Sequence, residues 1–197
     1  MEKGAALLIV DVQNDFCPGG ALAVPDGDRV VEPLNRAADC FSAAGLPVMA
    51  SRDWHPLQTS HFKEFGGVWP PHCIQGTPGA AFHPALRLPP GTVVISKGSE
   101  PDTDCYSAFD GNSADGGTLP AILAQLQVSH LFIGGLATDY CVRSSALDAL
   151  RAGLKVTILT DAVAGVELVA GDSERALVEM KRAGALFCSV DDLSPRP

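Results

Sequence analysis

Six short, mostly apolar runs are spaced along this 197-residue chain. They lie at 5–10, 47–50, 92–95, 131–133, 156–159 and, more weakly, 186–190. None of them alternates apolar with polar residues, as a strand with one face in water does. We therefore expect strands that are buried on both faces, as in a parallel sheet.

Segments with the 3.6-residue period of a helix separate these runs. They cover 28–44, 118–126, 139–152 and 172–183, and a glycine follows three of them as a stop signal. Alternating strands and helices predict right-handed βαβ units, with helices on both faces of the sheet. The sequence thus predicts an α/β protein with three layers, α/β/α, in a single domain covering 1–197.

Composition excludes several classes of protein. The net charge is −9 and no run of Lys or Arg occurs, so we expect neither nucleic acid nor a membrane surface as a partner. No apolar stretch approaches the roughly 18 residues of a spanning helix, and 1–12 is too short and ends too acidic for a signal peptide. Six scattered cysteines without a CxxC pair indicate a reducing, cytoplasmic setting.

Polar residues follow the predicted strands. Asp11 comes after the first run, 52–55 after the second, Lys97 after the third and 135–141 after the fourth. Ligands of open parallel sheets bind beyond the carboxyl ends of the strands. We therefore expect a carboxylate, a ligand-rich loop, an ammonium and a thiol along one rim of the sheet.

Three of these residues are candidates for catalysis. Cys141 stands in the first turn of a predicted helix, where the helix dipole favours a thiolate nucleophile and free amides can bind an oxyanion; a buried structural cysteine is the alternative. Burial at a strand end would raise the pKa of Asp11, which suits a general acid or base, whereas Asp15 fits a turn residue better. Lys97 could stabilise an oxyanion, or it could be a solvated lysine.

The loop at about 53–90 has the composition of a metal site. Its candidate ligands are Asp53, His55, His61 and His72. Asp53 and His55 are two residues apart and point the same way in an extended segment. Three imidazoles and a carboxylate suit one divalent Zn, Fe or Mn ion. The alternative is scattered surface histidines, a description that fits His83 and His130.

Three aromatic residues lie in the same loops: Phe16, Trp69 and Tyr106. Such side chains can sandwich a planar ring, and ordinary loop packing is the alternative.

Five segments in a fixed order carry a resemblance to a known family. They are DVQNDF at 11–16, DWHP at 53–56, WPPHC at 69–73, SKG at 96–98 and GLATDYCV at 135–142. Together they resemble the nicotinamidase/pyrazinamidase branch of the isochorismatase-like cysteine hydrolases, and the match runs from about residue 5 to 190.

The resemblance implies a six-stranded, mainly parallel sheet and a function for each candidate. It implies a catalytic triad of Asp11, Lys97 and Cys141, and an oxyanion hole from the amides of Ala137 and Cys141 beside a cis peptide. By similarity, Phe16, Trp69 and Tyr106 would line the ring pocket, and Asp53, His55 and His72 would bind the metal. Many relatives have Ser where this chain has His61; a His there is similar to the mycobacterial pyrazinamidase arrangement and implies a fourth ligand.

The implied reaction is hydrolysis of nicotinamide, and of pyrazinamide, through a thioester on the cysteine. The implied binding partner is a small neutral amide. The sequence leaves open whether the chain forms a homo-oligomer. Three alternatives remain: a metal-free amidase of the N-carbamoyl type, isochorismatase itself, and a non-catalytic ligand-binding relative.

Overall fold

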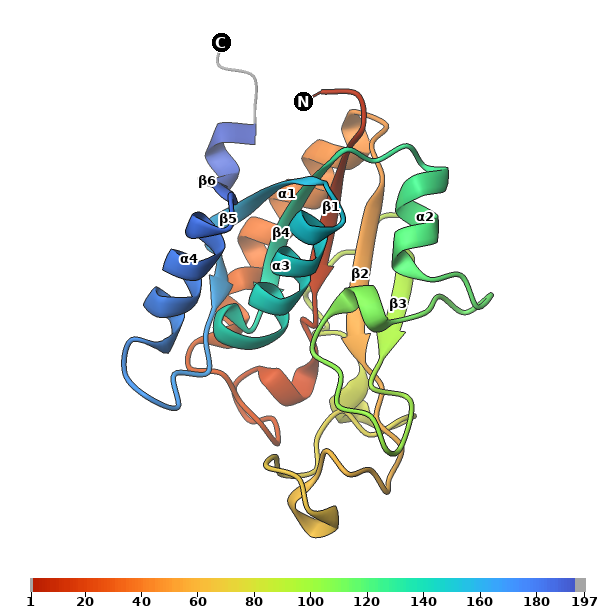
Figure 1. Ribbon diagram of the computed structural model, residues 1–197, viewed down its shortest axis with the longest axis vertical. Coiled ribbons are helices and arrows are strands. Elements are labelled where there is room, and N and C mark those ends of the chain that lie inside the picture. The colour runs from red at the N-terminus through yellow and green to blue at the C-terminus, as the bar shows by residue number, and fades with distance from the viewer. Residues whose placement is uncertain (1, 194–197) are drawn as a thin grey trace.

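The computed structural model describes residues 2–193 and contains one six-stranded sheet (Figure 1). The strands are β1 (Ala5–Val10), β2 (Val48–Asp53), β3 (Val93–Lys97), β4 (His130–Leu136), β5 (Lys155–Ala164) and β6 (Leu186–Cys188). Their order is β3-β2-β1-β4-β5-β6, and every neighbouring pair is parallel. The predicted parallel α/β fold is confirmed.

Helices cover both faces of the sheet (Figure 1). One face packs on α1 (Val31–Ala43), and the other on α2 (Leu119–Gln125), α3 (Arg143–Arg151) and α4 (Asp172–Arg182). Successive side chains of a strand point to opposite faces, so Leu7 of β1 packs in the core beneath α1 and Leu8 in the other core. None of the helices within 2–193 is long and apolar enough to cross a bilayer.

Several strands extend further than their apolar runs suggest. β4 includes Gly135 and Leu136, which were expected to follow it, and β5 continues through Ala164. β2 continues through Asp53 and β3 through Lys97, and these two residues are opposite each other in the ladder. The prediction that both residues follow their strands was therefore wrong. Backbone pairing does not depend on apolar side chains, so the ladder continues after the apolar run stops.

The sixth strand also differs from the expectation of a strand buried on both faces. β6 forms an edge of the sheet, spans only three residues, and leaves Leu186 48% exposed. An edge strand has a neighbour on one side only, so less of it is covered.

The long segment between β2 and β3 first extends beyond the carboxyl ends of the strands and then returns past α1, where Asn35 binds Ala85 and Arg87 (Figure 1). Gln13, just after β1, anchors it from both sides. The Gln13 side-chain amide donates to the carbonyl oxygens of Asp53 and Ala80 and accepts from the Asp53 amide, at 2.8–2.9 Å. These buried bonds fix both parts of the loop against the end of the central strand.

Candidate active site and metal centre

Three candidate residues meet at the carboxyl edge of the sheet because neighbouring parallel strands end there. Asp11 follows β1, Lys97 ends β3, and Cys141 lies in the turn after β4. The Lys97 Nζ is 3.0 Å from Asp11 Oδ2 and 3.3 Å from Cys141 Sγ, and it also donates to Asp53 Oδ1. All four side chains are buried. The structure thus brings the predicted thiol, ammonium and carboxylate into contact.

Lys97 and Asp53 form a buried ion pair. Burial by itself disfavours an ammonium, but the carboxylates of Asp11 and Asp53 raise the pKa of Lys97 well above its ordinary value. Burial likewise disfavours the Asp53 carboxylate, but Lys97, with the imidazoles of His55 and His72, holds its pKa well below the usual range. Both groups are therefore charged near neutral pH.

Asp11 has the properties of a proton-transfer group. Burial raises its pKa, the charge of Lys97 opposes this, and the nearby charge of Asp53 adds to the rise. The Ser51 hydroxyl donates to Asp11 Oδ1 at 2.7 Å, so Oδ2 faces Lys97. The backbone φ of Asp11 is 48°, a left-handed conformation that is costly for a residue with a side chain and is typical of functional sites.

Cys141 occupies its predicted position but is buried. It lies in the first turn after β4, in a helical turn at Thr138–Val142 that leads into α3. However, burial raises the pKa of the Cys141 thiol well above its ordinary value even though Lys97 opposes the rise. Desolvation therefore outweighs the nearby positive charge, which by itself would favour a thiolate. A thiol of this kind needs a base, and its Sγ lies within 4.8 Å of a carboxylate oxygen of Asp11.

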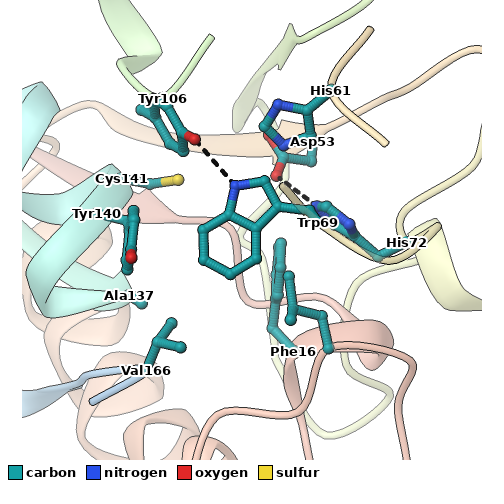
Figure 2. Close-up of a pocket in the computed structure, with 11 residues that line it drawn as sticks. Phe16, Asp53, His61, Trp69, His72, Tyr106, Ala137, Tyr140, Cys141 and Val166 are labelled. Carbon is teal, nitrogen blue, oxygen red and sulfur yellow. Dashed lines mark hydrogen bonds and ion pairs between the residues drawn. The ribbon is translucent and has the colours of Figure 1, made fainter. Parts of the chain in front are cut away.

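The turn before Cys141 begins at a cis peptide between Leu136 and Ala137. The Ala137 carbonyl accepts hydrogen bonds from the amides of Tyr140 and Val142. Ala137, at the start of this turn, and Cys141 line the same cavity (Figure 2).

Aromatic side chains enclose this cavity (Figure 2). Phe16, Trp69 and Tyr106 all line it, and the Trp69 indole N–H donates to the Tyr106 hydroxyl at 2.9 Å. The structure therefore brings the three predicted ring-pocket residues together. The Cys141 sulfur projects into the same space (Figure 2).

Three further lining residues were missed from the sequence: Leu22, Tyr140 and Val166. Tyr140 packs edge-on against Trp69, with ring centroids 5.0 Å apart. Its position directly before Cys141 was a usable signal. Leu22 and Val166 come from segments with no pattern that indicates a site.

Three histidines converge beside the cavity. His55, His61 and His72 each offer a ring nitrogen, and these atoms lie within 4.8 Å of one another. Asp53 Oδ2 lies 3.6 Å from His55 Nε2 and 3.8 Å from His72 Nε2. The four predicted metal ligands are therefore adjacent, and Asp53 lies between the histidines and Lys97.

The hydrogen bonds of these three imidazole rings are compatible with binding of a cation through Nε2. Each Nδ1 has an oxygen acceptor: His55 has the Gly98 carbonyl at 3.0 Å and His72 the Pro70 carbonyl at 2.8 Å. His61 Nδ1 lies 2.7 Å from Asp104 Oδ1. With Nδ1 protonated, Nε2 carries a lone pair, and within residues 2–193 the buried His55 Nε2 has no hydrogen-bond partner. An unpartnered buried nitrogen beside two further imidazoles and a carboxylate fits the donor set of a divalent metal.

The other two histidines lie outside this cluster. His83 is half-buried and accepts from the Ala85 amide. His130 is buried at the start of β4, with Nε2 2.8 Å from the Thr157 hydroxyl, so describing it as a surface histidine was wrong. Pairing of β4 with β5 covers the ring.

Comparison with known proteins agrees with this geometry. The chain matches the isochorismatase domain over residues 5–192. Nicotinamidase of Escherichia coli is 42% identical over 203 residues, with 95% of each chain covered. The structure of Pyrococcus horikoshii pyrazinamidase in complex with zinc has a TM-score of 0.87 at 46% identity, covering 94% of this chain and 99% of that one. PnC1 from L. infantum in complex with nicotinate has a TM-score of 0.84 at 32% identity, covering 96% and 94%. The chain therefore belongs to the isochorismatase family.

Proposed function

We propose that this protein is a metal-dependent cysteine amidohydrolase that converts nicotinamide to nicotinate and ammonia, and that it also accepts pyrazinamide. One observation carries the proposal: the Cys141 sulfur lies 3.3 Å from the Lys97 ammonium and projects into an aromatic cavity beside three imidazoles. Relatives named nicotinamidase and pyrazinamidase align with nearly the whole chain and support the substrate class. We place the reaction in the cytoplasm.

The cavity suits a flat, neutral amide. Phe16 and Trp69 offer ring faces to the pyridine, and Tyr106, which accepts the Trp69 hydrogen bond, fixes the indole. Tyr140 adds a further aromatic wall. This placement directs the carboxamide carbon of the substrate toward Cys141.

Acylation uses the buried triad. Asp11 accepts the thiol proton as the Cys141 sulfur attacks the amide carbon. The amides of Ala137 and Cys141 bind the oxyanion, and Lys97 supplies a positive charge beside it. Asp11 then protonates the leaving nitrogen, the carbon–nitrogen bond breaks, and ammonia departs from a thioester on Cys141.

In deacylation Asp11 again transfers a proton from the nucleophile to the leaving group. Asp11 accepts a proton from the water that attacks the thioester carbon, and returns it to the sulfur as the carbon–sulfur bond breaks. The products are nicotinate and the free Cys141 thiol, so one water is consumed in each cycle.

Asp53, His55, His61 and His72 would hold one divalent ion: Zn, Fe or Mn. Such an ion supplies Lewis-acid chemistry at the edge of the ring pocket. Asp53 contacts Lys97 through one oxygen and faces two imidazoles through the other, so the same carboxylate belongs to both sites.

Ammonia release from nicotinamide, with elemental analysis of the same sample, tests the proposal. We expect turnover of nicotinamide and pyrazinamide and one bound metal ion per chain. Hydrolysis of an N-carbamoyl amide by a metal-free sample, with nicotinamide untouched, would favour the amidase alternative. Failure to release ammonia from any amide would leave a ligand-binding relative.

A further inference from the structure

The three imidazoles of the metal centre are oriented by different kinds of acceptor. Nδ1 of His55 and of His72 each faces a backbone carbonyl oxygen, which every residue type supplies. His61 Nδ1 faces a side chain, the carboxylate of Asp104, at 2.7 Å. The hydrogen bond that orients His61 therefore depends on a side chain, which a substitution at Asp104 removes.

Asp104 reaches His61 from a different part of the chain. It lies in the loop after β3, 43 residues away, and the Asp104 side chain is 63% exposed whereas that of His61 is 4% exposed. A backbone bond from the Ser60 amide to the Pro101 carbonyl, at 2.7 Å, joins the two segments. This contact holds the carboxylate at the outer edge of the buried ring.

The backbone of His61 has little freedom to adapt. A side chain at Gly67 would come within 2.2 Å of the His61 carbonyl oxygen, so the two segments are in close contact. The His61 ring stacks on His55, with centroids 4.6 Å apart and planes at 20°. Stacking restricts the plane of the ring but does not decide which of its two nitrogens faces the other imidazoles.

We infer that Asp104 is a positioning residue for the metal centre, whose carboxylate selects the ring orientation and the tautomer of His61 that present Nε2 to a divalent cation. A carboxylate only accepts hydrogen bonds, so the proton stays on Nδ1 and the lone pair on Nε2. Partners of this kind orient metal-bound histidines and raise their basicity. The inference rests on the proposed metal site.

The loop after β3 thus supplies hydrogen-bond acceptors to two histidines of the metal centre. Gly98 accepts from His55 and Asp104 accepts from His61, while Tyr106, two residues further on, lines the ring pocket. This loop contains no metal ligand of its own and orients two of the three histidines.

Zinc affinity, measured by chelator competition on the metal-free full chain, tests this inference. We expect Asp104→Ala to weaken Zn²⁺ binding about 10- to 100-fold, and Asp104→Glu to recover most of the affinity. Asp102→Ala is the matched control, because it removes an exposed carboxylate from the same loop and should bind zinc like the wild type. The metal-free variants should melt at the same temperature as the metal-free wild type.

A double-mutant cycle separates positioning from a general charge effect. In a His61→Ser background, Asp104→Ala should change zinc affinity no further, because the ring that it orients is gone. Equal zinc affinity in Asp104→Ala and wild type, an equal loss in Asp102→Ala, or a loss that persists without His61 would overturn the inference. The assay contains no amide, so a failure to hydrolyse nicotinamide would count against the proposed function alone.

Discussion

The Nζ atom of Lys97 lies 3.3 Å from the Sγ atom of Cys141, inside the protein and away from solvent. The same ammonium contacts the carboxylates of Asp11 and Asp53. One cation therefore contacts two buried acids and stands where negative charge forms during thiol attack. Both the stability of this edge of the sheet and the proposed reaction therefore depend on Lys97.

Replacing Lys97 by Met should destabilise the protein as well as inactivate it. In the metal-free protein the change leaves two buried carboxylates without a cation, which costs about 3–5 kcal/mol of unfolding free energy. Urea denaturation followed by fluorescence measures the loss. Lys63→Met is the control: Lys63 is exposed, so its removal should change stability by less than about 0.5 kcal/mol. A Lys97→Met protein as stable as the wild type would contradict the ion-pair assignment.

Asp11→Asn should lower kcat/KM by at least about 10²-fold, because the base is lost while the shape is kept. In the wild type the base must be ionised, and burial raises the pKa of Asp11 above its ordinary value of 3.8. The acid limb of the kcat/KM profile should therefore lie above that pH and fall as the pH falls. Asp115→Asn, in an exposed loop, should leave both rate and profile unchanged. An active Asp11→Asn enzyme would remove Asp11 from the mechanism.

The parallel sheet was predictable because uninterrupted apolar runs occur only where both faces of a strand are covered. The meeting of Asp11, Lys97 and Cys141 followed from topology, since parallel strands end at one edge. Strand ends were less predictable: Asp53 and Lys97 belong to their strands through backbone bonds that side chains do not reveal.

Other features depend on contacts between distant segments, which no local pattern records. The raised pKa of the Cys141 thiol follows from its depth of burial. Val166 enters the cavity because the Asp139 carboxylate holds its amide at 2.9 Å, across 27 residues. Asp104 is an exposed acid in a polar loop, and only folding shows that it contacts His61.

Chelation should remove one metal ion per chain and lower activity. It should also lower the melting temperature, because an ion that binds only the folded state stabilises that state. Calorimetry and the ammonia assay, before and after Zn²⁺ is restored, measure both effects. His83→Ala should respond to chelation like the wild type, since His83 lies outside the ligand cluster. Full activity in a verified metal-free sample would refute a role for the metal.

His130 should make stability depend on pH. Burial lowers the pKa of His130 below its ordinary value of 6.5, so the unfolded chain takes up this proton more readily than the folded one. Its contribution to stability is present above pH 6.5 and is lost as the pH falls toward the lower folded-state pKa. His130→Gln should therefore lose less stability than the wild type between neutral and mildly acidic pH, as measured by thermal unfolding. Identical pH dependence in both proteins would show that His130 titrates alike in the two states.

The proposed reaction requires the Cys141 sulfur as its nucleophile. Ammonia release from nicotinamide, measured on zinc-loaded wild type, Cys141→Ala and Cys188→Ala that are each shown to be folded, tests this requirement. We predict turnover by the wild type and by Cys188→Ala, whose substitution lies on the edge strand β6, and a loss of about 10⁴-fold or more in Cys141→Ala. Substantial ammonia release by folded Cys141→Ala would show that Cys141 is not the nucleophile.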